Sequence, residues 1–153
     1  MSSELKSPVE NFINWETNKG NKTFLIQPIN GKNHEFSWER VGIEARKICS
    51  YIKSFNFPKN SKIAIISKNC AHWMMTDMAI MMSGHISVPL YPNLNAETLA
   101  KILMHSESKL LFVGKLDNFD DMKSGIPVGM DCITFPFYPE NYPRWDDITE
   151  EVD

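Results

Sequence analysis

A chain of 153 residues suits a single domain, and its 42% apolar and 23% charged residues exclude disorder along the whole length. The net charge of −3 hides an asymmetry: residues 1–114 carry 13 Lys/Arg and 9 Asp/Glu, whereas residues 115–153 carry 3 and 10. Neither part has a basic run with interleaved aromatic residues, which argues against nucleic-acid binding.

The first residues lack the apolar core of a signal peptide, and the richest apolar stretch, 73–82, is too short to span a bilayer. We therefore expect no transmembrane segment. Cys49, Cys70 and Cys132 are far apart in the sequence and form no CxxC pair. This pattern fits a protein of the reducing cytosol better than a disulfide framework or a zinc site.

The chain opens with a predicted helix. Ser7 is a good N-cap, Pro8 suits the first helical position, and Glu10 completes a capping box, while Gly20 is a suitable stop. The dipeptide Asn30-Gly31 then predicts a tight β-hairpin.

A second helix is predicted to begin after Ser37 and to end before Pro58. Its apolar residues recur at helical spacing from Val41 to Phe55 and form one buried face. We place four charged residues on the opposite, solvent-facing side: Arg40, Glu44, Lys47 and Lys53.

Three short apolar runs, beginning near residues 62, 86 and 110, follow at equal spacing in the centre of the chain. A helical segment, 69–82, lies between the first two, and a helix capped by Asn95 lies between the second and third. Strand, helix, strand, helix, strand is the pattern of a parallel sheet, and continuous apolar runs are typical of strands buried on both faces. The fold class is therefore α/β, with a mainly parallel open sheet flanked by helices, plus the N-terminal helix and hairpin.

The domain organisation follows from this pattern. Residues 1–115 form the α/β subdomain, and residues 116–153 form an acidic extension rich in proline and aromatic residues, with a fourth parallel strand expected at 132–135. The extension is too apolar for a free linker, so we expect it to lie against this domain or a missing neighbour.

Recognised catalytic motifs are missing from the sequence. There is no G-x-G-x-x-G turn, no G-x-x-x-x-G-K-[ST] loop and no G-x-S-x-G elbow. The four histidines are dispersed, and we interpret each of them as structural or exposed: His34, His72, His85 and His105. The sequence therefore offers no catalytic residue and no metal ligand.

The centre of the chain nevertheless resembles the adenylate-forming superfamily, in particular its long-chain fatty acid and acyl-CoA ligase branch. The likeness covers roughly residues 8–115. It depends on the following residues: Ile65-Ile66-Ser67-Lys68-Asn69, Trp73, Asp77-Met78-Ala79, Gly84 and Val88-Pro89-Leu90-Tyr91-Pro92.

This resemblance implies a parent enzyme that activates a fatty acid with ATP and Mg²⁺ and then transfers the acyl group to coenzyme A. The family's phosphate loop, its Tyr-Gly-x-Thr-Glu segment, its ribose-binding aspartate and its catalytic lysine lie beyond residue 153. We therefore expect no cofactor on this piece alone, no activity from it, and the remainder of the same polypeptide as its partner. The expected location is cytoplasmic, with peripheral membrane association of the parent left open.

One loop is a candidate binding element. Tyr91, Pro92, Asn93 and Asn95 leave the carboxyl end of a predicted strand just before a helix N-terminus, where backbone N–H groups favour anions. The family analogy puts coenzyme A near this loop in some members, and a purely structural turn is the competing interpretation.

Two other functions stay open on sequence alone. A self-contained flavodoxin-like module would bind a nucleotide at its own switch point. A non-catalytic interaction domain would use the methionine-rich helix around Met74–Met82 and the aromatic tail to bind a partner.

Overall fold

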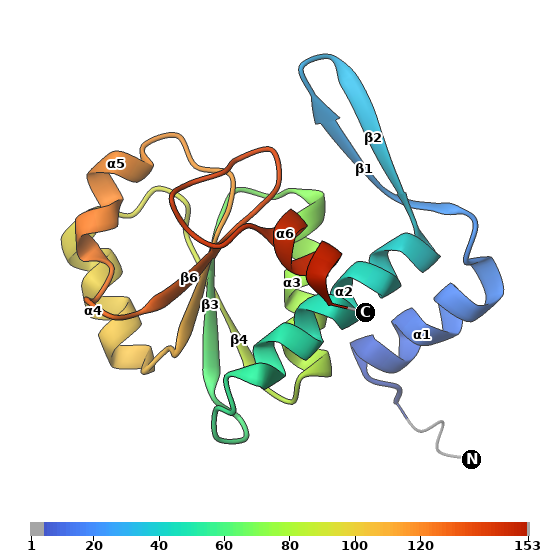
Figure 1. The fold of residues 1–153 in the computed structure, drawn as a ribbon, viewed down its shortest axis with the longest axis horizontal. Coiled ribbons are helices and arrows are strands. Elements are labelled where there is room, and N and C mark those ends of the chain that lie inside the picture. The colour runs from blue at the N-terminus through green and yellow to red at the C-terminus, as the bar shows by residue number, and fades with distance from the viewer. Residues whose placement is uncertain (1–4, 153) are drawn as a thin grey trace.

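The computed structural model describes residues 5–152, which form a hairpin and a four-stranded sheet with helices on both faces (Figure 1). In chain order the elements are α1 (Pro8–Lys19), β1 (Thr23–Ile29), β2 (Lys32–Ser37), α2 (Trp38–Ser54), β3 (Lys62–Ile66), α3 (Ala71–Met82), β4 (Ile86–Leu90), α4 (Ala96–Ser106), β5 (Leu110–Val113), α5 (Phe119–Met122), a 3₁₀ turn η1 (Lys123–Gly125), β6 (Asp131–Thr134) and α6 (Trp145–Glu151).

The larger sheet is parallel throughout, with strand order β4-β3-β5-β6. Ala64 of β3 pairs with Val88 of β4 and with Leu111 of β5. The three apolar runs are therefore the parallel strands expected from the sequence, and β6 is the fourth. The predicted fold class is confirmed.

Alternate strand residues serve two separate cores because successive side chains of a strand point to opposite faces. Ile63 and Ile65 face α2, α3 and α6, whereas Ala64 and Ile66 face α4 and α5. Figure 1 shows these two groups of helices on either side of the sheet. Burial on both faces explains why the strands are apolar without alternation.

The predicted helix caps are present. The Ser7 backbone N–H donates to Glu10 Oε2 at 2.7 Å, and the Glu10 N–H donates to Ser7 Oγ at 3.2 Å, which completes the capping box. Ser37 accepts from the Arg40 N–H at 3.1 Å and so caps α2. Asn95 caps α4 in the same manner.

The hairpin of β1 and β2 projects from the body of the molecule (Figure 1). Asn30 and Gly31 both have positive φ, 49° and 74°, as a tight two-residue hairpin turn requires. The buried side chain of Gln27 anchors the hairpin, because its Oε1 accepts from the Ala71 N–H at 2.9 Å. This bond occurs at the start of α3, which begins at Ala71 and not at Asn69 as predicted, since Cys70 occupies the cap position in an extended conformation.

One residue of α2 was misplaced by the sequence interpretation. Glu44, expected on the solvent-facing side, is only 5% exposed. It lies three residues after Val41 and four before Ile48, so it belongs to the buried stripe of the helix. Its carboxylate accepts from the Trp145 indole N–H at 2.9 Å and is paired with Arg40.

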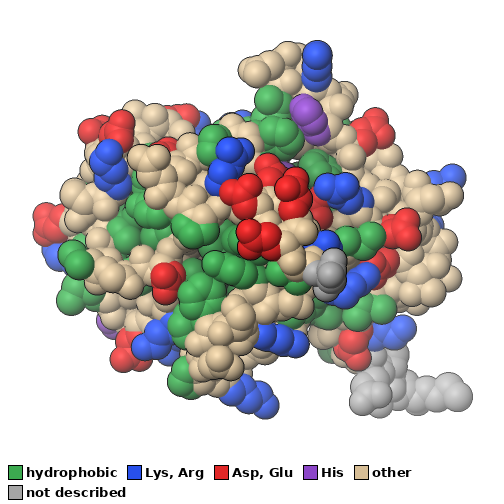
Figure 2. Space-filling model, viewed as in Figure 1, with side chains coloured by type: hydrophobic (Ala, Val, Ile, Leu, Met, Phe, Trp, Pro, Cys, Tyr) green, Lys and Arg blue, Asp and Glu red, His purple; other side chains and the backbone are tan. Residues whose placement is uncertain are grey.

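That indole belongs to α6, which packs on α2 and closes one face of the core. Trp145 is fully buried, together with Phe135 and Phe112 beneath it. The four acidic residues of α6 face outward and gather over this helix in Figure 2: Asp146, Asp147, Glu150 and Glu151.

Candidate functional site

The carboxyl ends of β3, β4 and β5 meet at one edge of the sheet, the usual position of ligand sites in open α/β folds. Three segments leave this edge: residues 67–70, 91–95 and 114–118. The middle one contains the predicted coenzyme A loop. It lies between two hollows.

The first hollow has a volume of about 350 Å³ and contains Tyr91 and Pro92 of the predicted site. Tyr91 is 78% exposed, so its ring is available to a ligand or to a neighbouring chain. The other lining residues are Ser67, Asn69, Trp73, Pro89 and Leu90. In the described part of the chain, no acidic side chain lines this hollow, which makes it compatible with an anionic or a neutral polar ligand.

The second hollow, about 270 Å³, contains Pro92, Asn93 and Asn95. Asp117 and Asp121 also line it, and their carboxylates disfavour a phosphate there. Asn95 is already engaged, because its Oδ1 accepts from the Thr98 N–H at 2.8 Å as the cap of α4. The structure therefore brings Tyr91 and Pro92 together at one hollow and assigns Asn95 a structural role that explains its position without a ligand.

The switch point of the sheet lies between β3 and β5, whose following helices, α3 and α5, cover opposite faces. It is closed. The Lys68 N–H donates to the Lys115 carbonyl at 2.8 Å, and Ser67 Oγ accepts from the Lys115 N–H at 2.9 Å. A Cβ on Gly114 would lie 2.4 Å from Ser67 Oγ, so the two segments touch. No nucleotide fits between them without separating them.

A buried polar cluster escaped the sequence analysis. His72 of α3 is 3% exposed, and its Nε2 lies 3.8 Å from Glu44 Oε2, beyond hydrogen-bond distance. Burial lowers the pKa of His72 to about 4, against the opposing effect of Glu44, so the imidazole is neutral at pH 7. Three aromatic rings surround it edge-on: Phe36, Phe137 and Trp145. The helical spacing of Glu44 from Val41 was the one signal in the sequence that could have revealed this cluster.

The cluster forms the floor of a small pocket of about 300 Å³ between the hairpin, α2 and the segment before α6. The Glu44 carboxylate is paired with Arg40 and accepts from the Trp145 indole N–H, so His72 is its more distant neighbour. Phe137 covers it with a positive φ of 68°, a conformation that is costly for this residue type. This arrangement positions α6 and the hairpin, and no Ser, Thr or Cys of residues 5–152 lines the pocket.

The cysteines offer no reactive thiol at the sheet edge. Burial raises the pKa of Cys132 to about 12, and it also raises the pKa of Cys70 and of Cys49. All three are free of disulfides. Within residues 5–152, no three His, Cys, Asp or Glu side chains converge as a metal site would require. The helices described are all too short or too polar to cross a membrane.

Comparison with known proteins identifies the family. The model of the AMP-binding enzyme family matches residues 12–139, most of the chain. The chain belongs to the AMP-binding enzyme family.

Among curated members of this AMP-binding family, fatty acyl-CoA synthetase A of Dictyostelium discoideum is 34% identical over 89 residues, which cover 56% of this chain and 13% of that protein. Trans-cinnamate:CoA ligase of Petunia hybrida is 31% identical over 78 residues, which cover 51% of this chain and 14% of the relative. The matched segment thus spans about one seventh of the length of these relatives.

Solved structures show the same fold in this AMP-binding family. An anthranilate CoA ligase solved with anthranoyl-AMP aligns with a TM-score of 0.81 at 18% identity, covering 94% of this chain and 28% of that one. A benzoate CoA ligase of Burkholderia xenovorans aligns with a TM-score of 0.82 at 11% identity, covering 97% and 29%. The α/β fold described above is therefore the fold of a part of these enzymes.

The side chains of residues 5–152 do not fit an ATP–Mg²⁺ site. The sequence contains no glycine-rich phosphate loop, and no set of carboxylates converges in the described part of the chain. Among residues 5–152, no acidic side chain lines the hollow beside Tyr91, whereas Asp117 and Asp121 line the second hollow. No step of the reaction is assigned to a side chain of these 153 residues.

Proposed function

We propose that this chain is the N-terminal part of an ATP-dependent, AMP-forming long-chain fatty acid–CoA ligase. The observation that carries the proposal is the match of the AMP-binding enzyme model to residues 12–139. The name of the Dictyostelium relative, a fatty acyl-CoA synthetase, supports the substrate class. Other relatives are named for cinnamate and butyrate, so the preference for a long acyl chain is the more specific part of the proposal.

The reaction of the parent has two steps. A fatty acid carboxylate attacks the α-phosphate of ATP, which gives an acyl-adenylate and pyrophosphate. The thiol of coenzyme A then attacks the acyl carbon and displaces AMP, which gives the thioester. Mg²⁺ and cationic donors would stabilise the charge that develops on the phosphates.

In this proposal the chain supplies scaffold, and the remainder of the polypeptide supplies the reactive groups. Tyr91, Pro92 and Asn93 would contribute a wall to the coenzyme A side of the assembled enzyme, with Asn95 holding the loop in place. The division into residues 1–115 and 116–153 is part of the same proposal. A cytoplasmic location is also part of this proposal.

The closed switch point argues against the flavodoxin-like alternative. A nucleotide would have to break the contacts of Ser67 and Lys68 with Lys115. Titration of the chain with flavin mononucleotide and ATP separates the two functions. Micromolar binding that is lost on replacing Gly114 with alanine would favour the self-contained module.

The first prediction concerns activity. The purified 153-residue chain should show no acid-dependent exchange of pyrophosphate into ATP, because it lacks the groups that bind and polarise the phosphates. A complete long-chain ligase of the family, assayed beside it, should show exchange. A measurable rate from the chain alone would refute the assignment of the chemistry to the missing part.

The coding sequence after Asp153 provides an independent test. The proposal expects an open frame that encodes a Ser/Thr/Gly-rich phosphate loop with its lysine and a later catalytic lysine. A natural stop codon at this position would contradict the proposal, because the scaffold would then have no reactive part to support.

A further inference from the structure

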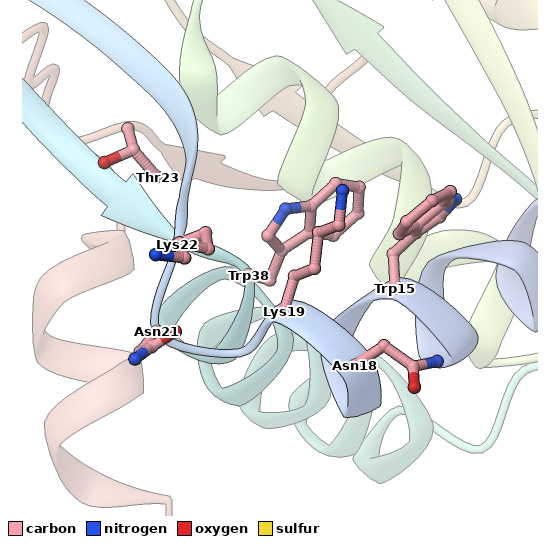
Figure 3. A pocket seen from close by; sticks show the side chains of 7 residues that line it. All are labelled: Trp15, Asn18, Lys19, Asn21, Lys22, Thr23 and Trp38. Carbon is pink, nitrogen blue, oxygen red and sulfur yellow. The ribbon is translucent and has the colours of Figure 1, made fainter.

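A surface pocket far from the sheet edge lies between α1, the turn into β1 and the first residue of α2. Its volume is about 640 Å³, within the range of roughly 300–1,000 Å³ that is usual for small-molecule sites. Figure 3 shows its lining residues: Trp15, Asn18, Lys19, Asn21, Lys22, Thr23 and Trp38. The proposed ligase activity assigns no role to this pocket.

Two indole rings form its walls. Trp38 is stacked on Phe24, with ring centroids 3.7 Å apart and planes 16° from parallel, so its position is fixed from behind. The Trp15 ring centroid lies 6.3 Å from that of Trp38 at an angle of 31°, and Trp15 is 43% exposed. Exposed aromatic faces held in place by other rings can stack with a planar ligand at little entropic cost.

The turn between α1 and β1 is also held rigidly. The first two backbone N–H groups of α2 donate to it: that of Trp38 to the Lys22 carbonyl at 3.1 Å and that of Glu39 to the Gly20 carbonyl at 2.9 Å. Lys22 and Asn21 therefore project from a backbone whose position relative to Trp38 is set by hydrogen bonds. The pocket is preformed.

The charge of the pocket is positive, although the chain as a whole is acidic. Lys19 and Lys22 line it, and none of the Asp or Glu side chains that the structure describes does. Neither lysine has a carboxylate at ion-pair distance within residues 5–152. Two acidic residues nearby have partners: Glu16 pairs with Arg46, and Glu35 accepts from the hydroxyl of Thr23, itself a lining residue, at 3.0 Å. Glu39, which follows Trp38, is exposed and is not one of the lining residues.

A simpler explanation accounts for only part of this arrangement. The Lys19 ammonium lies 4.4 Å from the centroid of the Trp15 ring, a cation–π pair worth about 0.5–1 kcal/mol at an exposed site. That pair explains why Trp15 is tolerated at the surface. It does not explain Lys22, the amide of Asn21, or the absence of acidic side chains of residues 5–152 from the lining.

We propose that this pocket binds a planar aromatic anion of the nucleoside monophosphate kind. The base would stack on the indoles of Trp15 and Trp38, and the phosphate would lie between Lys19 and Lys22. Two cations suit a dianionic phosphate better than a single carboxylate, and the amide of Asn21 would donate to a remaining oxygen. The Asn18 amide is already engaged, because its Nδ2 donates to the Asn14 carbonyl at 2.7 Å.

Calorimetric titration of the full 153-residue chain with AMP is the direct test, with adenosine, ribose 5-phosphate and benzoate as partial ligands. AMP should bind at least about tenfold more tightly than each partial ligand, since each lacks the ring or the phosphate. Benzoate binding as tightly as AMP would overturn the proposal. Tighter binding of a single-stranded oligonucleotide would also overturn it, in favour of a nucleic-acid surface.

Matched variants locate the site. Lys22→Gln should weaken AMP binding about tenfold, the loss expected for one charge-assisted hydrogen bond, whereas Lys32→Gln, an exposed lysine outside the pocket, should leave it unchanged. Trp15→Leu should reduce the affinity for AMP and leave that for ribose 5-phosphate unchanged. Thermal melts confirm that each variant is folded. Equal losses for Lys22→Gln and Lys32→Gln, or no AMP binding by the folded wild type at millimolar concentration, would refute the proposal.

Discussion

His72 shows at the residue scale how burial sets a protonation state. Its pKa is lowered to about 4 chiefly because the imidazole is enclosed by α2, α3, the hairpin and the segment before α6. The carboxylate of Glu44 opposes this shift, and the Arg40 guanidinium reinforces it. The ionisable groups His34, Glu35 and Asp146 also line the adjoining pocket.

The sign of the pH dependence follows from this depressed pKa. In the unfolded chain His72 takes up a proton as pH falls through its ordinary pKa of about 6.5. In the folded protein the same residue stays neutral until pH falls to about 4, so the unfolded state binds more protons between these two values. Stability should therefore decrease as pH falls through this window, by up to about 3 kcal/mol. Urea denaturation at pH 7.5 and pH 4.5 measures the difference. His72→Phe should reduce this acid sensitivity and the control His105→Gln should retain it; equal sensitivity of both variants would exclude His72 as the cause.

At the scale of single elements, a helix can be capped by a neighbouring residue or by one that is distant in the sequence. The cap of α3 comes from Gln27, 44 positions earlier, because Cys70 supplies no side-chain bond. Gln27→Leu should destabilise the protein by about 1–2 kcal/mol, since it leaves the buried Ala71 N–H without an acceptor.

Amide hydrogen exchange at Ala71, together with the urea midpoint, measures this effect. Gln27→Glu preserves an acceptor oxygen and should retain protection of this amide better than Gln27→Leu does. Unchanged exchange at Ala71 in Gln27→Leu would show that the hairpin does not cap α3.

Asn95 and Asn93 lie in the predicted coenzyme A loop, and their alanine variants can be compared to test the structural role of Asn95. Asn95 caps α4, so Asn95→Ala should cost about 1 kcal/mol and Asn95→Asp should cost little. Asn93 is exposed and makes no side-chain hydrogen bond within residues 5–152, so Asn93→Ala should leave stability unchanged. Thermal denaturation distinguishes the two; an equal loss for both alanine variants would contradict the structural role given to Asn95.

The acidic extension completes the core at the scale of the whole molecule. β6 adds the fourth strand, and Trp145 fills the space between α2 and the sheet. A chain ended after Pro143 should therefore expose Phe112 and Phe135, bind a hydrophobic dye and lose its cooperative thermal transition. A chain ended after Glu151 retains α6 and should melt like the full chain. A cooperative transition in the shorter chain would refute this role.

The sequence by itself determined the local elements and the fold class. The capping box of α1 and the Asn30-Gly31 turn depend on neighbouring residues, and the three apolar runs depend on burial of both strand faces. Both kinds of feature leave a local signature in the sequence. The resemblance around residues 65–92 likewise predicted the family that the matched model identifies.

Tertiary structure alone decided the remainder. The strand order β4-β3-β5-β6, the Gln27 cap, the closure of the switch point and the Glu44–Trp145 bond each join residues distant in sequence. The pocket of Trp15 and Trp38 also unites separate segments, and its positive charge is invisible in the net charge. Periodicity shows which face of an element is buried, whereas the partners of that face are set by packing between elements.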